Sequence, residues 1–300
     1  MSLASKAEGE TLSTGIFYGI LAALIWGGWP VVSRLGVQQT LAFTDITALR
    51  FAVAGLLLLP LVWRGGVGAV GWPRALLLAA GAGAPYVLCA VGGLTFAPAG
   101  HAGVIIPSCM LAFSTLGSWL FLGDRPGRDR LAGLGLIMAG VLLIGWQGLA
   151  QGAAGAWIGD LLFVAAGFLW ASYTVASRAW SVDPLHGTAL VSVLSFLLYL
   201  PTYLALGEPR LFVAPLSEVA FQAAFQGLFA AILALLFYSR SVALLGAARG
   251  AVFAALVPGV AIVLAYPVLG ERPTWLELSG LAIVSLGMVY ALGLRRTGSR

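Results

Sequence analysis

Long apolar runs follow one another along the whole 300-residue chain, and only short polar turns separate them. Charged residues make up 9% of the sequence, whereas a soluble domain carries roughly 25%. A soluble chain this apolar would have too few polar groups to cover its surface, so the surface must face lipid. Backbone groups in lipid have to be satisfied internally, and runs of this length suit spanning helices better than a barrel. The sequence therefore predicts an all-α integral membrane protein.

Ten transmembrane helices are predicted from these runs. Several of their boundaries carry turn signals, of which Arg64-Gly65-Gly66 is one. None of the connections is long enough for a soluble domain. The predicted spans cover residues 14–35, 42–63, 73–95, 99–122, 129–147, 157–178, 187–206, 217–239, 247–269 and 274–294.

The distribution of Lys and Arg predicts the orientation of these spans. With the N-terminus in the cytoplasm, twelve basic residues lie inside and four lie outside, namely Arg34, Arg50, Arg210 and Arg272. Both termini are then cytoplasmic, which requires an even number of spans. The basic residues are scattered rather than clustered, so no nucleic-acid partner is expected. We expect a multi-pass protein of the bacterial inner membrane, surrounded by lipid.

The second half of the chain repeats the first. A shift of 144 residues places Trp26 on Trp170 and Arg34 on Arg178, a shift of 141 matches span two to span seven, and a shift of 147 matches spans four and five to nine and ten. Apolar helices match easily by chance, but paired Trp and Ser-Arg positions do not. Since each half holds five spans, the second half must be inverted relative to the first, which predicts a substrate site between the halves near the bilayer midplane. The predicted parts are an N-terminal tail (1–13), two repeats (14–147 and 157–294), a linker (148–156) and a C-terminal tail (295–300).

Short motifs in both halves resemble the drug/metabolite transporter superfamily and its EamA-type domain. They are Ala23-Leu24-Ile25-Trp26-Gly27 in the first span, Leu269-Gly270-Glu271-Arg272-Pro273 after the ninth, and Leu122-Gly123-Asp124-Arg125-Pro126 after the fourth. Asp124 stands where the usual motif has Glu. The resemblance implies ten spans around a central cavity lined by spans one, three and four and their counterparts six, eight and nine. Within the superfamily, the sequence resembles the branch that exports aromatic amino acids and some cationic toxicants.

Two symmetry-related helix faces are candidates for the cavity wall. Each carries two aromatic residues and a serine at positions i, i+3 and i+7, which share one face of a helix. Such faces suit an aromatic substrate, although packing or lipid contact would also explain them. These residues are Trp26, Trp29 and Ser33 in span one, and Trp170, Tyr173 and Ser177 in span six.

Spans three, four and eight add further candidates for the cavity: Tyr86, His101, Ser108 and Phe237. Ionisable residues within membrane spans are costly and are often functional, but His101 can also be a structural group. Prolines bend helices, and bends at corresponding positions of two halves point to gating. Pro30, Pro85, Pro107 and Pro258 are therefore predicted hinges, with tolerated kinks as the alternative.

The charged residues inside spans are few. We expect Arg34, Asp45, Arg50 and Asp160 to form ion pairs near the outer face. No carboxylate falls at the middle of a span, which favours a facilitator or an exchanger, although His101 leaves proton coupling open. His186 is the only other histidine, so no metal site is expected. There is no phosphate-binding loop, so neither ATP nor another cofactor is expected.

These features together predict a transporter that exports or exchanges small metabolites by alternating access. An aromatic or other apolar amino acid fits the candidate cavity best. The alternative is a cationic toxicant, a sugar or another small compound carried by the same fold. The sequence contains no catalytic cluster of the kind that a membrane enzyme needs. A rigid scaffold would avoid so many Pro and Gly residues inside its spans. A monomer can suffice for this activity.

Overall fold

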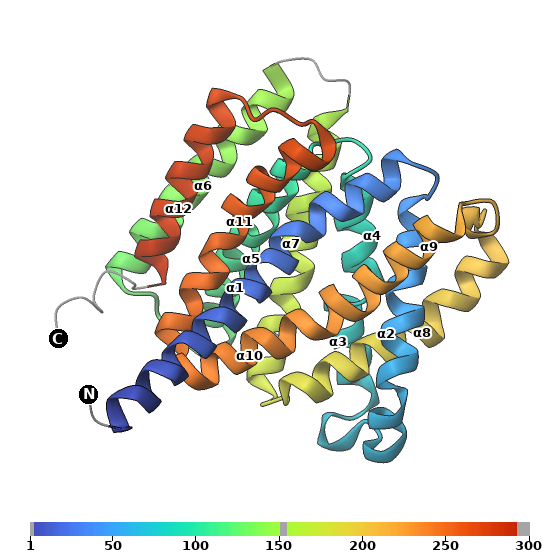
Figure 1. Cartoon of the computed structure of the whole chain (residues 1–300), viewed down its shortest axis with the longest axis horizontal. Helices are drawn as coiled ribbons and strands as arrows, with labels where there is room; N and C mark the ends of the chain where they lie inside the picture. Colours follow the sequence, from blue (N-terminus) through green and yellow to red (C-terminus); the bar gives the residue numbers. More distant parts are fainter. Residues whose placement is uncertain (1–2, 151–154, 293–300) are drawn as a thin grey trace.

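The computed structural model describes residues 3–150 and 155–292, and in these residues the chain is helical with no strand (Figure 1). Two single 3₁₀ turns, Gly68–Val70 and Arg210–Phe212, lie in loops. The helices are α1 (Leu3–Gln38), α2 (Phe43–Gly65), α3 (Trp72–Ala82), α4 (Ala84–Gly93), α5 (Ala99–Leu122), α6 (Arg128–Ala150), α7 (Ala156–Ala179), α8 (Pro184–Leu206), α9 (Leu216–Ala223), the π-helix η3 (Ala224–Leu233), α10 (Ala234–Leu245), α11 (Ala247–Leu269) and α12 (Trp275–Ala291).

Nine stretches of the described residues are long and apolar enough to cross a membrane, and α12 is a shorter apolar helix of the same kind. Together they account for the ten predicted segments. The helix α1 begins at Leu3, within the predicted N-terminal tail, and its apolar part begins at Leu12. The last eight residues, which include the predicted C-terminal tail, lie outside the described residues.

Spans three and eight are interrupted helices. Span three breaks between Ala82 and Ala84, where the freed N–H of Ala84 donates to the Ser195 hydroxyl of α8 at 3.2 Å. Pro85 has no N–H and cannot continue the preceding helix. Span eight passes from α9 through the π-helix η3 into α10. Non-ideal turns of this kind inside helices are frequent at functional sites.

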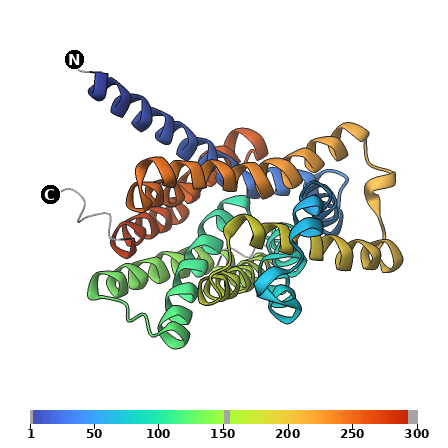
Figure 2. The same cartoon turned by 90° about the horizontal axis from the view of Figure 1, so that it is seen from below.

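The first span of each half packs against helices of the other half. The first span of the first half, α1, packs against α10 and α11 of the second half, and the first span of the second half, α7, packs against α4 and α5 of the first. Seen from below, α1, α10 and α11 form one layer and α5, α6 and α7 form another (Figure 2). The start of α1 and the end of α12 lie toward the same end of the bundle (Figure 1).

Glycines bring α6 and α12 into close contact. A Cβ at Gly133 would lie 2.6 Å from the carbonyl oxygen of Gly287, and one at Gly140 would lie 2.8 Å from that of Gly280. Small residues let backbones approach in membranes, where packing rather than the hydrophobic effect drives helix association. The α6–α12 pair is therefore held by a two-point glycine seam formed by these four residues.

Candidate functional site

Four aromatic side chains form a row that runs from α1 through α4 to α7. The ring centroids of Trp29 and Tyr86 lie 6.1 Å apart, those of Tyr86 and Trp170 lie 4.8 Å apart, and those of Trp170 and Tyr173 lie 5.7 Å apart. These separations fall in the range of favourable aromatic pairs. All four residues were predicted as cavity residues from the sequence, and the fold brings them together. The row joins helices from both halves of the chain.

Arg50 of α2 caps the row at its Trp29 end. The guanidinium carbon lies 5.7 Å from the Trp29 ring centroid, which is a cation–π geometry. In the part of the chain that the structure describes, Arg50 has no carboxylate within ion-pair distance. The predicted ion pair of Arg50 is therefore wrong. A half-buried guanidinium without a carboxylate inside a membrane protein is costly, which makes Arg50 a candidate functional residue.

Two glutamines of span eight bind the polar face of α1. Gln226 accepts a hydrogen bond from the Trp29 indole nitrogen at 2.7 Å and donates one to the Ser33 hydroxyl at 2.9 Å, while Gln222 donates to the Val32 carbonyl at 2.7 Å. Both glutamine side chains are fully buried. Ser33 consequently packs against a neighbouring helix. The sequence analysis missed this contact, although Gln222 and Gln226 stand out as two amide side chains four residues apart within an apolar run.

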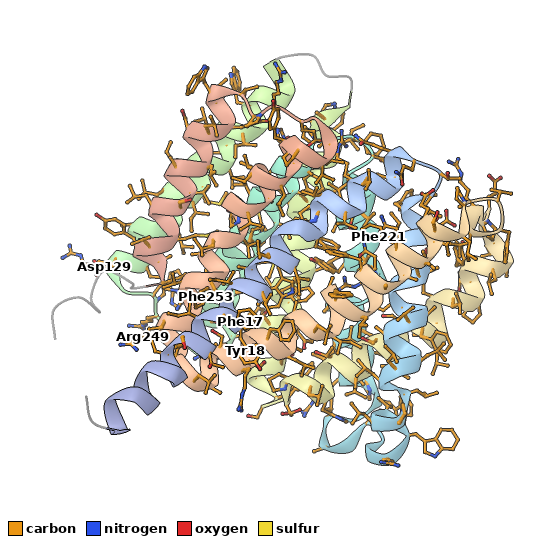
Figure 3. The ribbon with its side chains drawn as sticks, viewed as in Figure 1. Phe17, Tyr18, Asp129, Phe221, Arg249 and Phe253 are labelled. Carbon is orange, nitrogen blue, oxygen red and sulfur yellow. The ribbon has the colours of Figure 1, made fainter. Side chains whose placement is uncertain are left out.

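Two of the predicted aromatic residues lie elsewhere. The ring of Trp26 pairs with Tyr238 of α10 at 5.3 Å, and the ring of Phe237 stacks on Tyr18 at 5.7 Å. Figure 3 places Tyr18 in the lower part of α1. The structure therefore brings neither Trp26 nor Phe237 into the aromatic row.

The remaining predicted hydroxyls occupy α5 and α7. Ser108 is fully buried, and within the described residues its hydroxyl has no hydrogen-bond partner. Ser177 follows Tyr173 by one turn on α7. Both positions stay candidates for substrate contact.

The four predicted hinge prolines differ in their local structure. Pro85 lies at the break of span three, whereas Pro30, Pro107 and Pro258 lie inside the continuous helices α1, α5 and α11. An apolar pocket of about 300 Å³ lies beside the break, between α3, α4 and α8, and Pro85 lines it. A gating role for the prolines stays a prediction.

His101 is the centre of a buried ionisable cluster. Its Nδ1 lies 2.8 Å from an oxygen of Asp160 on α7, and its Nε2 lies 3.1 Å from an oxygen of Glu277 on α12. The three residues are 2%, 8% and 8% exposed. The sequence identified His101 but not its partners, because they come from distant spans. No group of three or more His, Cys, Asp and Glu side chains among the described residues is arranged to hold a metal ion.

Arg34 and Glu271 form a partly buried ion pair. Arg34 also donates to the carbonyls of Leu94 and Ala97, and Glu271 accepts from the N–H of Ala99 at 2.9 Å. This pair joins α1, the end of α4, the start of α5 and the loop after α11. The predicted pairing of Arg34 with Asp45 or Asp160 is therefore wrong.

Asp45 serves instead as a capping residue. It accepts hydrogen bonds from the backbone N–H groups of Ala42 at 2.7 Å and Arg210 at 3.1 Å, and from the Tyr203 hydroxyl. A carboxylate that caps a helix start satisfies backbone donors that have no partner within the helix.

Comparison with known proteins agrees with this architecture. The sequence pattern of the EamA-like transporter family matches residues 13–146 and again residues 157–293. A Salmonella typhimurium protein named a probable amino-acid metabolite efflux pump is 28% identical over 302 residues, which cover 94% of this chain and 96% of the relative. An uncharacterized transporter of Archaeoglobus fulgidus is 26% identical over 280 residues, which cover 90% of this chain and 94% of the relative.

A solved crystal structure shares the fold, with a TM-score of 0.63 and 21% identity over 96% of this chain and 99% of its own. The two family matches, one in each half, together cover most of the chain. The chain therefore belongs to the EamA-like transporter family and is a multi-pass membrane transporter.

Proposed function

We propose that this chain exports or exchanges aromatic and other apolar amino acids across the bacterial inner membrane, with both termini in the cytoplasm. One observation carries the proposal: the aromatic row of Trp29, Tyr86, Trp170 and Tyr173 ends at the guanidinium of Arg50, which has no carboxylate partner among the described residues. Aromatic rings would hold the side chain of such a substrate, and the guanidinium would hold its carboxylate.

Alternating access between two inverted halves would move the substrate. The exchanged contacts of α1 and α7 support this mechanism, because a rocking motion of two similar units requires equivalent interfaces on both sides. The aromatic row crosses between the halves, so relative motion of the halves would separate its rings. The name of the Salmonella typhimurium relative also favours an amino acid as the substrate.

The test is uptake by the purified protein in liposomes. We expect saturable uptake of labelled aromatic or apolar amino acids and a loss of about tenfold in affinity, which corresponds to 1.4 kcal/mol, in Trp170→Ala and in Arg50→Gln. Trp63→Ala, at an exposed tryptophan, and Arg272→Gln, at an arginine over the Tyr266 ring, are the matched controls.

The substrate panel also separates the alternatives. Cationic toxicants can stack on the same aromatic faces, so they belong in the panel, together with sugars. If the protein takes up cations but no amino acid, and Arg50→Gln takes up cations as well as the wild type does, the amino-acid proposal is wrong and a cationic substrate takes its place. Unchanged uptake in Trp170→Ala would remove the aromatic row from the site.

A further inference from the structure

The hydrogen bonds around His101 require one more proton than a neutral imidazole supplies. Both ring nitrogens lie within hydrogen-bond distance of a carboxylate oxygen, at 2.8 Å from Asp160 and 3.1 Å from Glu277. A neutral imidazole has one N–H, and an ionised carboxylate only accepts. One of the two contacts is then repulsive unless the ring binds a second proton, which the imidazole holds more readily than either carboxylate because it is the stronger base.

Burial makes that proton necessary for the observed geometry. His101, Asp160 and Glu277 are nearly inaccessible, so water cannot separate two facing lone pairs there. The second oxygen of Glu277 accepts from the N–H of Thr274 at 2.7 Å. The second oxygen of Asp160 is buried and has no hydrogen-bond partner within the described residues, which leaves an acceptor free in the cluster.

The charges around the cluster do not replace the proton. In the nearby ion pair of Arg34 and Glu271, the two charges cancel each other. The contact of Glu271 with the first turn of α5, which also carries His101, is a hydrogen bond from the N–H of Ala99. Charged residues of the neighbouring α6 and α11 lie at the other end of the bundle, where Figure 3 labels Asp129 and Arg249. The described part of α4 carries no Asp, Glu, Lys or Arg.

The cluster also connects the two halves. His101 lies on α5 of the first half, whereas Asp160 and Glu277 lie on α7 and α12 of the second. Loss of the proton removes one of the two hydrogen bonds that join His101 of α5 to α7 and α12. Any movement that separates α5 from α7 or α12 must therefore expose the cluster and change its affinity for protons.

From this geometry we propose that His101, Asp160 and Glu277 form a proton-binding site that holds this end of the bundle together when occupied. We further infer that the transport cycle binds and releases that proton, an inference that rests on the proposed transport function. The step moves a single proton between the cluster and water, and no other bond changes. The transporter would then couple its substrate to a proton gradient rather than act as a simple facilitator.

Histidine-selective NMR on the full chain in lipid nanodiscs tests the site directly. The chain has only two histidines, so His186→Gln assigns the ¹⁵N ring signals of His101. We expect two protonated ring nitrogens on His101 at pH 7 and a single one in Glu277→Gln, where the amide can donate to the ring. A wild-type His101 with one protonated nitrogen throughout pH 6–8, or a spectrum indifferent to Asp160→Asn and Glu277→Gln, would overturn the site. The wild-type spectrum decides even if a variant does not fold.

Proteoliposomes with an internal pH dye test the coupling. We expect substrate-dependent proton movement in the wild type and in His186→Gln, and at least a tenfold smaller dye signal per substrate molecule transported in Glu277→Gln, which removes one carboxylate of the cluster but is not a candidate cavity residue. An undiminished dye signal per substrate molecule in Glu277→Gln would refute the coupling. If the wild type carries no substrate of the panel, the proposed function fails, while the NMR result still decides whether the proton site exists.

Discussion

Arg178 donates a hydrogen bond to Asp124 at 2.8 Å and so ties the first helix of the second half to the loop after the fourth span of the first half. Arg34 and Glu271 make the reciprocal pair, from the first helix of the first half to the loop after the ninth span. The sequence repeat relates the two pairs, but their surroundings differ. The side chains of Arg34 and Glu271 are 17% and 19% exposed, whereas those of Arg178 and Asp124 are 59% and 38% exposed.

This difference predicts unequal contributions to stability. Glu271→Gln leaves the Arg34 charge without its partner in a largely buried site, so we expect a loss of about 1–3 kcal/mol in the free energy of unfolding. Asp124→Asn, the matched control, should leave stability unchanged, because exposed ion pairs contribute little. Thermal unfolding in detergent measures both variants, and equal losses would contradict the assignment.

The exposed pair also makes a prediction about pH. The Arg178 guanidinium, through its hydrogen bond and charge, lowers the pKa of the Asp124 carboxyl. A group whose pKa is lowered on folding contributes stability above its unfolded pKa and loses that contribution as the pH falls through the folded pKa. The unfolded value is about 4, so the pair should not respond to pH between 5 and 8. Stability profiles of the wild type and Asp124→Asn should run parallel there, and divergence above pH 6 would refute this.

The glycine seam between α6 and α12 predicts a steric effect. Gly287→Ala would place a Cβ 2.7 Å from the Gly133 carbonyl oxygen, and the backbone has to shift to relieve the clash. We expect a loss of about 1–3 kcal/mol, typical of overpacking. Gly135→Ala on α6 is the control, since its Cβ would meet nothing within 4 Å, and alanine there should be neutral or stabilising by up to about 1 kcal/mol. Urea or thermal unfolding separates the two.

The break in span three predicts a role for Ser195. Ser195→Ala leaves the buried N–H of Ala84 without its acceptor, so we expect a loss of about 1–3 kcal/mol. Ser172→Ala is the control, because the Ser172 hydroxyl is exposed and bonds only within its own helix. If both variants unfold at the wild-type temperature, the break does not depend on this contact.

The amide contact between α1 and span eight predicts that Gln226 stabilises the fold. Gln226→Ala leaves the Trp29 N–H and the Ser33 hydroxyl unpaired in a buried site, so we expect a loss of about 2–4 kcal/mol. Gln38→Ala, at an exposed position of α1, should have little effect. The blue shift of tryptophan fluorescence on loss of the Trp29 hydrogen bond gives a second readout. A stable variant with unchanged fluorescence would rule this contact out.

Hydrophobicity and periodicity determined the helical membrane architecture and the number of apolar segments, because in lipid each helix satisfies its own backbone groups. The repeat likewise led to Trp29, Trp170 and Tyr173, since i, i+3 spacing fixes which side chains share a face. Such arguments concern single helices. They identified the aromatic residues on each helix, but not the contacts between rings of different helices.

The partners of the charged and polar residues were decided by the tertiary structure alone. The pairing of His101 with Asp160 and Glu277 spans 59 and 176 residues of sequence, and Arg34 reaches Glu271 across 237. Which faces of two helices meet depends on how all the helices pack, and small residues such as Gly133 and Gly287 determine that packing through shape rather than polarity. The sequence alone therefore located the ionisable groups, while helix packing determined which of them share a buried proton.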